Sequence, residues 1–144
     1  MATEEEKLKD EIRKENQDNL DQLEGYEIRA GMYLSNVDLA VMKDEYEKAS
    51  EFLWGSIACY LNAIYFLRTG KSCSGHNAMI ALGERISVVT GDQRLENAIR
   101  IGEKMHSNHY HGFLRPEEFP GMYYEIMYAV SKLRELLILE KTRT

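Results

Sequence analysis

The sequence predicts an all-α protein: an up-and-down antiparallel bundle of four to five core helices, preceded by an acidic helix or arm. The chain has 144 residues, of which 44% are apolar and only 2 are proline, so it has the size and composition of one helical domain with a single core. Apolar side chains recur at spacings of 3 and 4 over most of its length, which is the helical period. No stretch shows the alternation of a β-strand, and no internal repeat is evident.

The first element is strongly acidic. Residues 3–24 contain nine acidic and four basic residues, which gives −5 of the total charge of −6. Thr3 and Glu6 form a capping-box pattern that favours a helix, but the segment has few large apolar side chains. We therefore assign residues 1–25 to a solvated helix or arm and residues 26–144 to the bundle domain. Because the acidic segment repels phosphate, a nucleic-acid surface is expected elsewhere.

Two longer helices should follow. Apolar spacing from Tyr26 predicts a helix to about Lys43. Asp44 is a favourable N-cap for the next helix, which is apolar nearly all round and should therefore lie at the centre of the bundle. Gly70 should end this central helix as a C-cap. The Gly-Lys-Ser sequence that begins there is not a phosphate-binding loop, because a helix rather than a strand precedes it.

The second half of the chain predicts a helical hairpin and a final helix. A shorter helix starts at about Ser74 or Gly75, with His76, Met79, Leu82, Ile86 and Val89 on its inner face. It turns at Gly91 into a helix beginning at Asp92 or Gln93. Pro116 and Pro120 predict a loop over residues 112–121, and a last helix runs from Met122 to about Lys141.

The hairpin places two histidines together. His76 lies fifteen residues before Gly91, and His106 lies fifteen residues after it. At about 1.5 Å per residue in two antiparallel helices, both should stand at the same height, at one pole of the bundle. The same pole should receive aromatic and basic side chains from the central and last helices: Phe66, Arg68, Tyr123 and Tyr124.

Two segments carry a family resemblance. WGSIACYLNAIYF at 54–66, MHSNHYHGF at 105–113 and the single His76 resemble the archaeal PaREP family of small helical proteins. The resemblance spans about residues 26–137 and implies a HEPN-type bundle (higher eukaryotes and prokaryotes nucleotide-binding). Many such proteins are metal-independent ribonucleases or dimeric toxin components that use an arginine, four to six residues, and a histidine. The resemblance therefore implies Arg100 and His106 as catalytic residues, RNA or nucleotide as ligand, and no cofactor.

Physical chemistry allows this activity and also an alternative. An imidazole can move the proton of a 2′-hydroxyl or leaving group, and a guanidinium can stabilise the phosphorane charge. However, six positions on a helix separate Arg100 from His106 by about 120°, so a shared pocket needs the long arginine stem or a dimer partner. Helical geometry favours the alternative, a histidine at the core edge and a solvated arginine near Glu96 or Glu103.

The remaining candidates are ligand-binding residues near the predicted pole: Arg68, His76, Asn108, His109, Tyr110 and His111. The imidazoles of His106, His109 and His111, with His76 as a fourth ligand, would also suit zinc. We favour aromatic packing over metal binding, with Asn108 and Tyr110 fixing the loop, and expect no metal or cofactor.

The composition limits the expected cellular location and the expected partners of the protein. No run of about 18 apolar residues occurs, and the acidic N-terminus is unlike a signal peptide, so we expect a cytoplasmic protein without membrane contact. Cys59 and Cys73 should be free thiols. A homodimer is expected because Tyr33, Tyr46, Trp54 and Tyr128 add more aromatic surface than short helices easily cover. A non-enzymatic dimeric interaction module is the alternative function.

Overall fold

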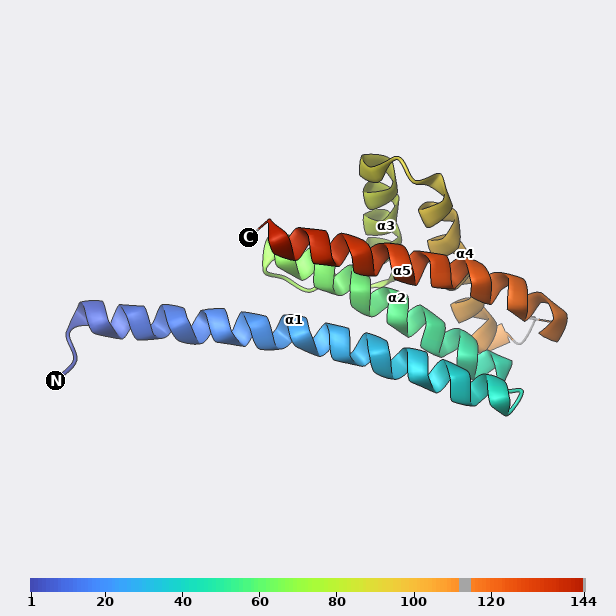
Figure 1. Cartoon of the computed structure of the whole chain (residues 1–144), viewed down its shortest axis with the longest axis horizontal. Coiled ribbons are helices and arrows are strands. Elements are labelled where there is room, and N and C mark those ends of the chain that lie inside the picture. The colour runs from blue at the N-terminus through green and yellow to red at the C-terminus, as the bar shows by residue number, and fades with distance from the viewer. Residues whose placement is uncertain (112–114, 144) are drawn as a thin grey trace.

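The computed structural model describes residues 1–111 and 115–143, without the side chains of 108–111. Its elements are α1 (Glu4–Met42), α2 (Tyr46–Thr69), α3 (His76–Thr90), α4 (Gln93–His111), the short 3-10 helix η1 (Pro116–Glu118) and α5 (Phe119–Thr142). Within the described residues every regular element is a helix, so the predicted all-α class is confirmed. Helices α1, α2 and α5 lie alongside one another, and the α3–α4 hairpin stands across them (Figure 1).

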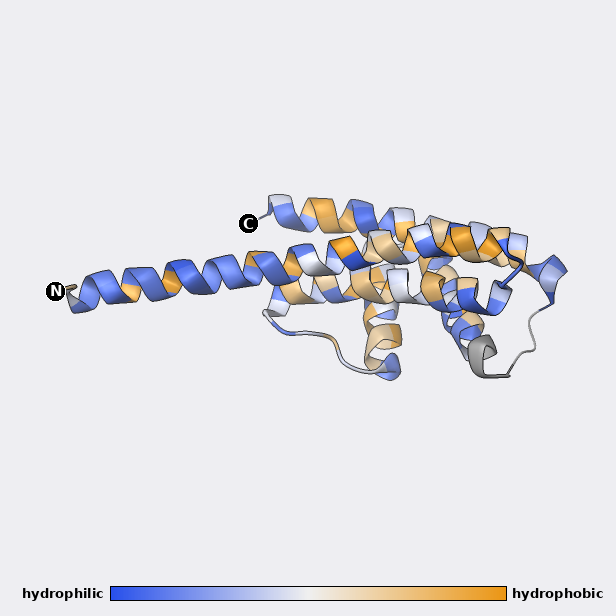
Figure 2. Ribbon diagram, turned by 90° about the horizontal axis from the view of Figure 1, so that it is seen from below, coloured by the Kyte–Doolittle hydropathy of each residue, from blue (hydrophilic) through white to orange (hydrophobic). Residues whose placement is uncertain are grey.

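The acidic segment and the first bundle helix are one continuous element. Thr3 caps α1 as predicted: its hydroxyl accepts the Glu6 amide N–H, and the Glu6 carboxylate accepts the Thr3 N–H. Residues 4–22 are exposed throughout and project beyond the other helices as a polar rod (Figure 2). Burial starts at Leu23, where α1 meets α2.

Helix α2 is the centre of the fold, as predicted. It packs against α1, α3, α4 and α5, and Trp54 is only 5% exposed on it. The predicted N-cap is wrong, because Asp44 adopts a left-handed conformation (φ 57°) in the preceding turn and the helix starts after Glu45. Gly70 ends α2 as predicted, with φ 73° and its N–H on the Phe66 carbonyl.

The connection from α2 to α3 turns back along α2. The Cys73 N–H donates to Asn62 Oδ1 at 2.8 Å, and the hydroxyl of Ser72 lies 2.6 Å from that of Tyr26. The six residues 70–75 can span at most about 20 Å, which equals the rise of about 13 helical residues. Helix α3 therefore begins beside the N-terminal half of α2 and not at its C-terminal end.

The α3–α4 hairpin is closely packed near its middle, and apolar side chains of α3 near its tip are exposed. At Gly83 an added Cβ would lie 2.9 Å from Ile99 Cδ1, so a glycine is what allows the helices to approach. Gly91 (φ 69°) makes the predicted turn. Val89, predicted to face inward, is 79% exposed, because the hairpin near its tip contacts α5 through Asp92 and Arg94 of α4 and not through this face of α3.

The last helix starts earlier than predicted. Helix α5 begins at Phe119, with Pro120 in its first turn, where the missing N–H breaks no helical hydrogen bond. Its buried side chains include Ile126, Val130, Leu133 and Leu137. No helix in the described part of the chain is long and apolar enough to cross a membrane.

Candidate functional site

The two histidines meet as predicted. The ring centroids of His76 and His106 are 4.4 Å apart. His76 is the first residue of α3 and is exposed, whereas the His106 side chain on α4 is 12% exposed. The proximity of the two histidines, predicted from the hairpin register, is therefore confirmed.

Two residues of α2 complete the group. The Trp54 ring lies 5.3 Å from the ring of His76 and 5.9 Å from that of His106. Nδ1 of His106 donates to Oε2 of Glu51 at 2.6 Å, since an ionised carboxylate only accepts. We call Glu51, Trp54, His76 and His106 the histidine cluster. It joins three helices, with a buried indole as its floor and a carboxylate that orients one imidazole.

Close helix packing and an open helix end shape this cluster. A Cβ on Gly102 would lie 2.9 Å from Ile57 Cδ1 and 3.3 Å from Trp54 Cε3, so only glycine lets α4 approach the indole this closely. No side chain in the described part of the chain caps helix α3, and the first turn of the helix has no acidic residue. A helix N-terminus of this kind, with its free N–H groups and positive dipole end, favours an anion beside His76.

Arg100 lies apart from this cluster. Its Nη2 is 2.6 Å from Glu84 of α3 and 3.1 Å from Glu96 of α4, and its side chain is 55% exposed. The predicted contact with Glu96 is thus confirmed, and the guanidinium secures the hairpin. Six positions along α4 separate it from His106 by about 9 Å of rise and 120° of rotation.

The predicted convergence of α2 and α5 on the histidines is wrong. Arg68 pairs with Glu140 of α5 at 3.2 Å, and fourteen residues of α2 place it about 21 Å from Trp54 along the axis. The ring centroid of Tyr124 lies 5.6 Å from Cζ of Arg94. Arg94 is at the opposite end of α4 from His106, so Tyr124 is distant from the histidines. The reason is the backward connection before α3, which carries His76 away from the end of α2.

The other predicted site residues belong to the end of α4. Asn108, His109, Tyr110 and His111 have helical backbone, and their side chains lie outside the described residues. Their ligand-binding role therefore stays a prediction. Across the residues that are described, no three His, Cys, Asp or Glu side chains group as a metal site requires. The zinc alternative depends on His109 and His111 and likewise stays a prediction.

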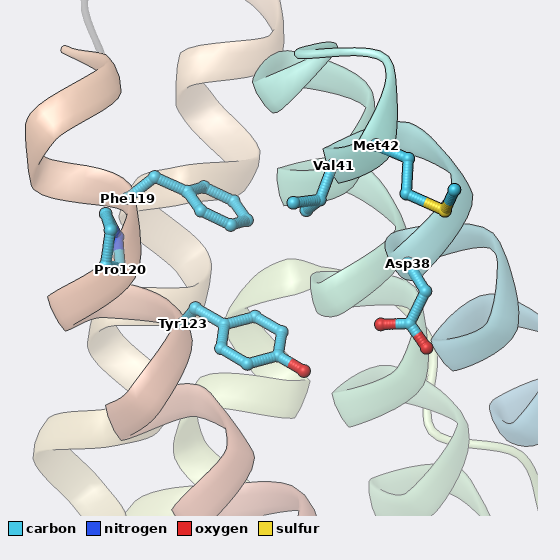
Figure 3. A pocket seen from close by; sticks show the side chains of 6 residues that line it. All are labelled: Asp38, Val41, Met42, Phe119, Pro120 and Tyr123. Carbon is cyan, nitrogen blue, oxygen red and sulfur yellow. The ribbon is translucent and has the colours of Figure 1, made fainter.

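A separate cavity lies between the end of α1 and the start of α5 (Figure 3). Its volume is about 420 Å³, and its lining is apolar except for one carboxylate and one phenol: Asp38, Val41, Met42, Phe119, Pro120 and Tyr123. The two polar groups point toward one another across the opening. The sequence did not indicate this cavity, because its walls come from segments about 80 residues apart.

Glu51 and Trp54 were also not identified as site residues. Glu51 follows Glu47 and Lys48 and therefore resembles an ordinary solvent-facing residue at the start of an apolar helix. Only the backward path of residues 70–75 reveals that this turn of α2 faces His76. Comparison with family models, curated proteins and solved structures gives no match, so the resemblance to PaREP and HEPN proteins stays a prediction.

Proposed function

We propose that the protein cleaves short single-stranded RNA without a metal ion, with His76 and His106 transferring the protons. The proposal rests on the 4.4 Å separation of the two rings and on the 2.6 Å hydrogen bond that orients His106 through Glu51. Paired imidazoles can supply both a general base and a general acid near neutral pH.

The proposed reaction is a transesterification within the RNA strand. One imidazole takes the proton of a 2′-hydroxyl, whose oxygen attacks the adjacent phosphorus and forms a 2′,3′-cyclic phosphate. The P–O5′ bond breaks, and the other imidazole gives a proton to the leaving 5′-oxygen. The N–H groups at the start of α3 would stabilise the negative charge on the phosphorane.

The charges around the cluster support a short substrate. Arg94 is paired with Glu125, and Arg100 is paired with Glu84, so neither is available to neutralise phosphates without breaking an ion pair. The projecting half of α1 is acidic. A long duplex needs many phosphate contacts, whereas one phosphodiester needs only the imidazoles and a helix N-terminus.

The test is cleavage of a labelled single-stranded RNA in EDTA. His76→Ala and His106→Ala should each lower the rate by about 100-fold or more, the usual loss for a positioned proton-transfer group. Arg68→Ala is the matched control, because Arg68 is exposed and lies at the other end of α2. Wild-type protein that leaves RNA intact at all pH values tested would exclude the proposal.

Arg100 separates this mechanism from the arginine–histidine mechanism that the family resemblance implies. If His76 is the partner of His106, Arg100→Ala should cut RNA at nearly the wild-type rate. If Arg100 stabilises the phosphorane, its loss should be as severe as that of His106. Circular dichroism of each variant controls for unfolding.

A further inference from the structure

Helix α1 carries an exposed apolar face. Ile28 is 55% exposed, Met32 60%, Leu39 56% and Met42 81%. With Ser35, which is also exposed, these residues follow one another at spacings of 4, 3, 4 and 3, the heptad pattern of a coiled coil. We call Ile28, Met32, Ser35, Leu39 and Met42 the α1 stripe.

Helix α1 has two apolar faces. One is buried against α2 and consists of Leu23, Tyr26, Ala30, Val37 and Ala40. The α1 stripe is the other. At about 100° per residue, the α1 stripe lies roughly opposite this buried series. One side of α1 is thus covered by its own chain, while the stripe is left to solvent. Contiguous exposed apolar surface of this kind marks an interaction site.

We propose that a second copy of this chain covers the α1 stripe, with the two α1 helices parallel. The flanking charges argue for this partner and orientation. Glu24 and Asp38 border one side of the stripe, and Arg29 and Lys43 border the other, each five residues further on. In a parallel pair, each acidic residue faces the basic residue five positions on in the second helix, whereas an antiparallel pair opposes like charges. Among the side chains that the structure describes, none of these four residues forms an ion pair.

The chemistry of α1 also sets the extent of the interface. Toward the N-terminus the same heptad positions hold Asp18, Asp21 and Gly25, so the apolar contact begins at Ile28. Toward the C-terminus Met42 continues into the cavity of Figure 3, which the second copy would therefore border. Two heptads plus this edge make a small interface, typical of a weak dimer.

Sedimentation over a range from about 10 to 200 µM tests the interface, because small interfaces dissociate upon dilution. Wild-type protein should shift from monomer to dimer, and Met32→Glu and Leu39→Glu should remain monomeric. The control is Val89→Glu. Val89 is apolar, like Met32 and Leu39, and is 79% exposed, but it lies near the hairpin tip and outside the α1 stripe. A wild-type monomer throughout, or a dimer that survives Leu39→Glu, would overturn the proposal.

Disulfide formation tests the orientation. Parallel pairing brings the two copies of residue 39 together, so Leu39→Cys should cross-link upon oxidation. Antiparallel pairing about Ser35 would shift them by about 12 Å along the axis and beyond disulfide reach. Cys59 and Cys73 should not compete, because both are buried and burial raises the pKa of each thiol. Cross-linking only in a mixture of Met32→Cys and Leu39→Cys would contradict the parallel arrangement.

This interface is independent of the proposed RNA cleavage. The histidine cluster belongs to α2, α3 and α4 and contains no residue of α1. Leu39→Glu should therefore abolish association and leave the cleavage rate of a folded monomer unchanged. The sedimentation result and the cleavage result can each fail without the other.

Discussion

The rings of His76 and His106 lie 4.4 Å apart, although thirty residues and a hairpin turn separate them in sequence. Antiparallel helices of equal rise put residues equidistant from the turn at the same height, which is why the register alone determined this relationship. The third and fourth members of the cluster come from α2, where Glu51 orients His106 and Trp54 packs beneath both rings.

Glu51→Gln should slow RNA cleavage by about 10-fold or more while leaving the fold intact. The amide still accepts a hydrogen bond from His106, but it cannot balance a positive charge on that imidazole. The reduction should be in kcat rather than in KM, because Glu51 acts through His106.

Glu47→Gln is the matched control for this substitution. Glu47 lies one turn earlier on α2 and is exposed. A similar rate for the two variants would mean that the carboxylate of Glu51 does not position the histidine.

Gly102→Ala should destabilise the protein by about 1 to 3 kcal/mol, because its methyl group would lie 2.9 Å from Ile57 Cδ1 and 3.3 Å from Trp54 Cε3. Because Trp54 supports both histidines, the cleavage rate should fall as well. Gly25→Ala is the contrast: no atom lies within 4 Å of its added Cβ, so the better helix propensity should stabilise α1 by about 0.5 to 1 kcal/mol. Urea denaturation of both variants measures this difference, and a shift of the same sign for the two would contradict the packing described at α4.

Asp92→Ala should lower the free energy of unfolding by about 1 kcal/mol near neutral pH. Asp92 accepts the Leu95 N–H at 3.0 Å and the Tyr128 hydroxyl at 2.7 Å, which ties the start of α4 to α5. Burial raises the pKa of the Asp92 carboxyl, but the hydrogen bonds from Tyr128 and the backbone outweigh it, so the pKa is lower than usual.

The sign of this shift fixes the pH dependence. A carboxyl whose pKa is lower in the folded state contributes stability above its unfolded value of about 3.9 and loses it as the pH falls through the folded value. The difference between wild type and Asp92→Ala should therefore be largest near pH 7 and shrink below about pH 4. Urea denaturation at several pH values measures it. A difference that grows upon acidification would show that Asp92 stabilises the fold in its protonated form.

Local signals were sufficient for most of the helices. The capping box at Thr3, the glycine ends at Gly70 and Gly91, and the apolar period of α2 all depend on neighbours in sequence, and all three were predicted correctly. The errors occurred at helix ends, where a residue can take a different position in the turn or first helical turn without losing backbone hydrogen bonds. Asp44 occupies a left-handed turn position instead of a cap, and Pro120 lies within the first turn of α5 instead of before it.

The site was predictable only in part, because its geometry depends on the course of the connection between α2 and α3, and the helical spacing of apolar residues does not reveal that course. The hairpin register was sufficient to bring His76 to His106. Nothing in the local sequence indicates that residues 70–75 run back along α2. Because of this path, the histidines lie beside Glu51 and Trp54 and not beside Arg68, which was predicted to be near them. The spacing of Arg100 and His106 in sequence was likewise no guide to proximity, since six helical positions point the two side chains in different directions.

The pH dependence of RNA cleavage in EDTA tests the central claim most directly, because paired imidazoles must act in opposite protonation states. We predict a bell-shaped profile of kcat/KM with its maximum between about pH 5 and 8, and the loss of one limb in the residual activity of His76→Ala or His106→Ala. A profile that is flat across this range, or wild-type cleavage that disappears in EDTA and returns with added metal, would contradict the account.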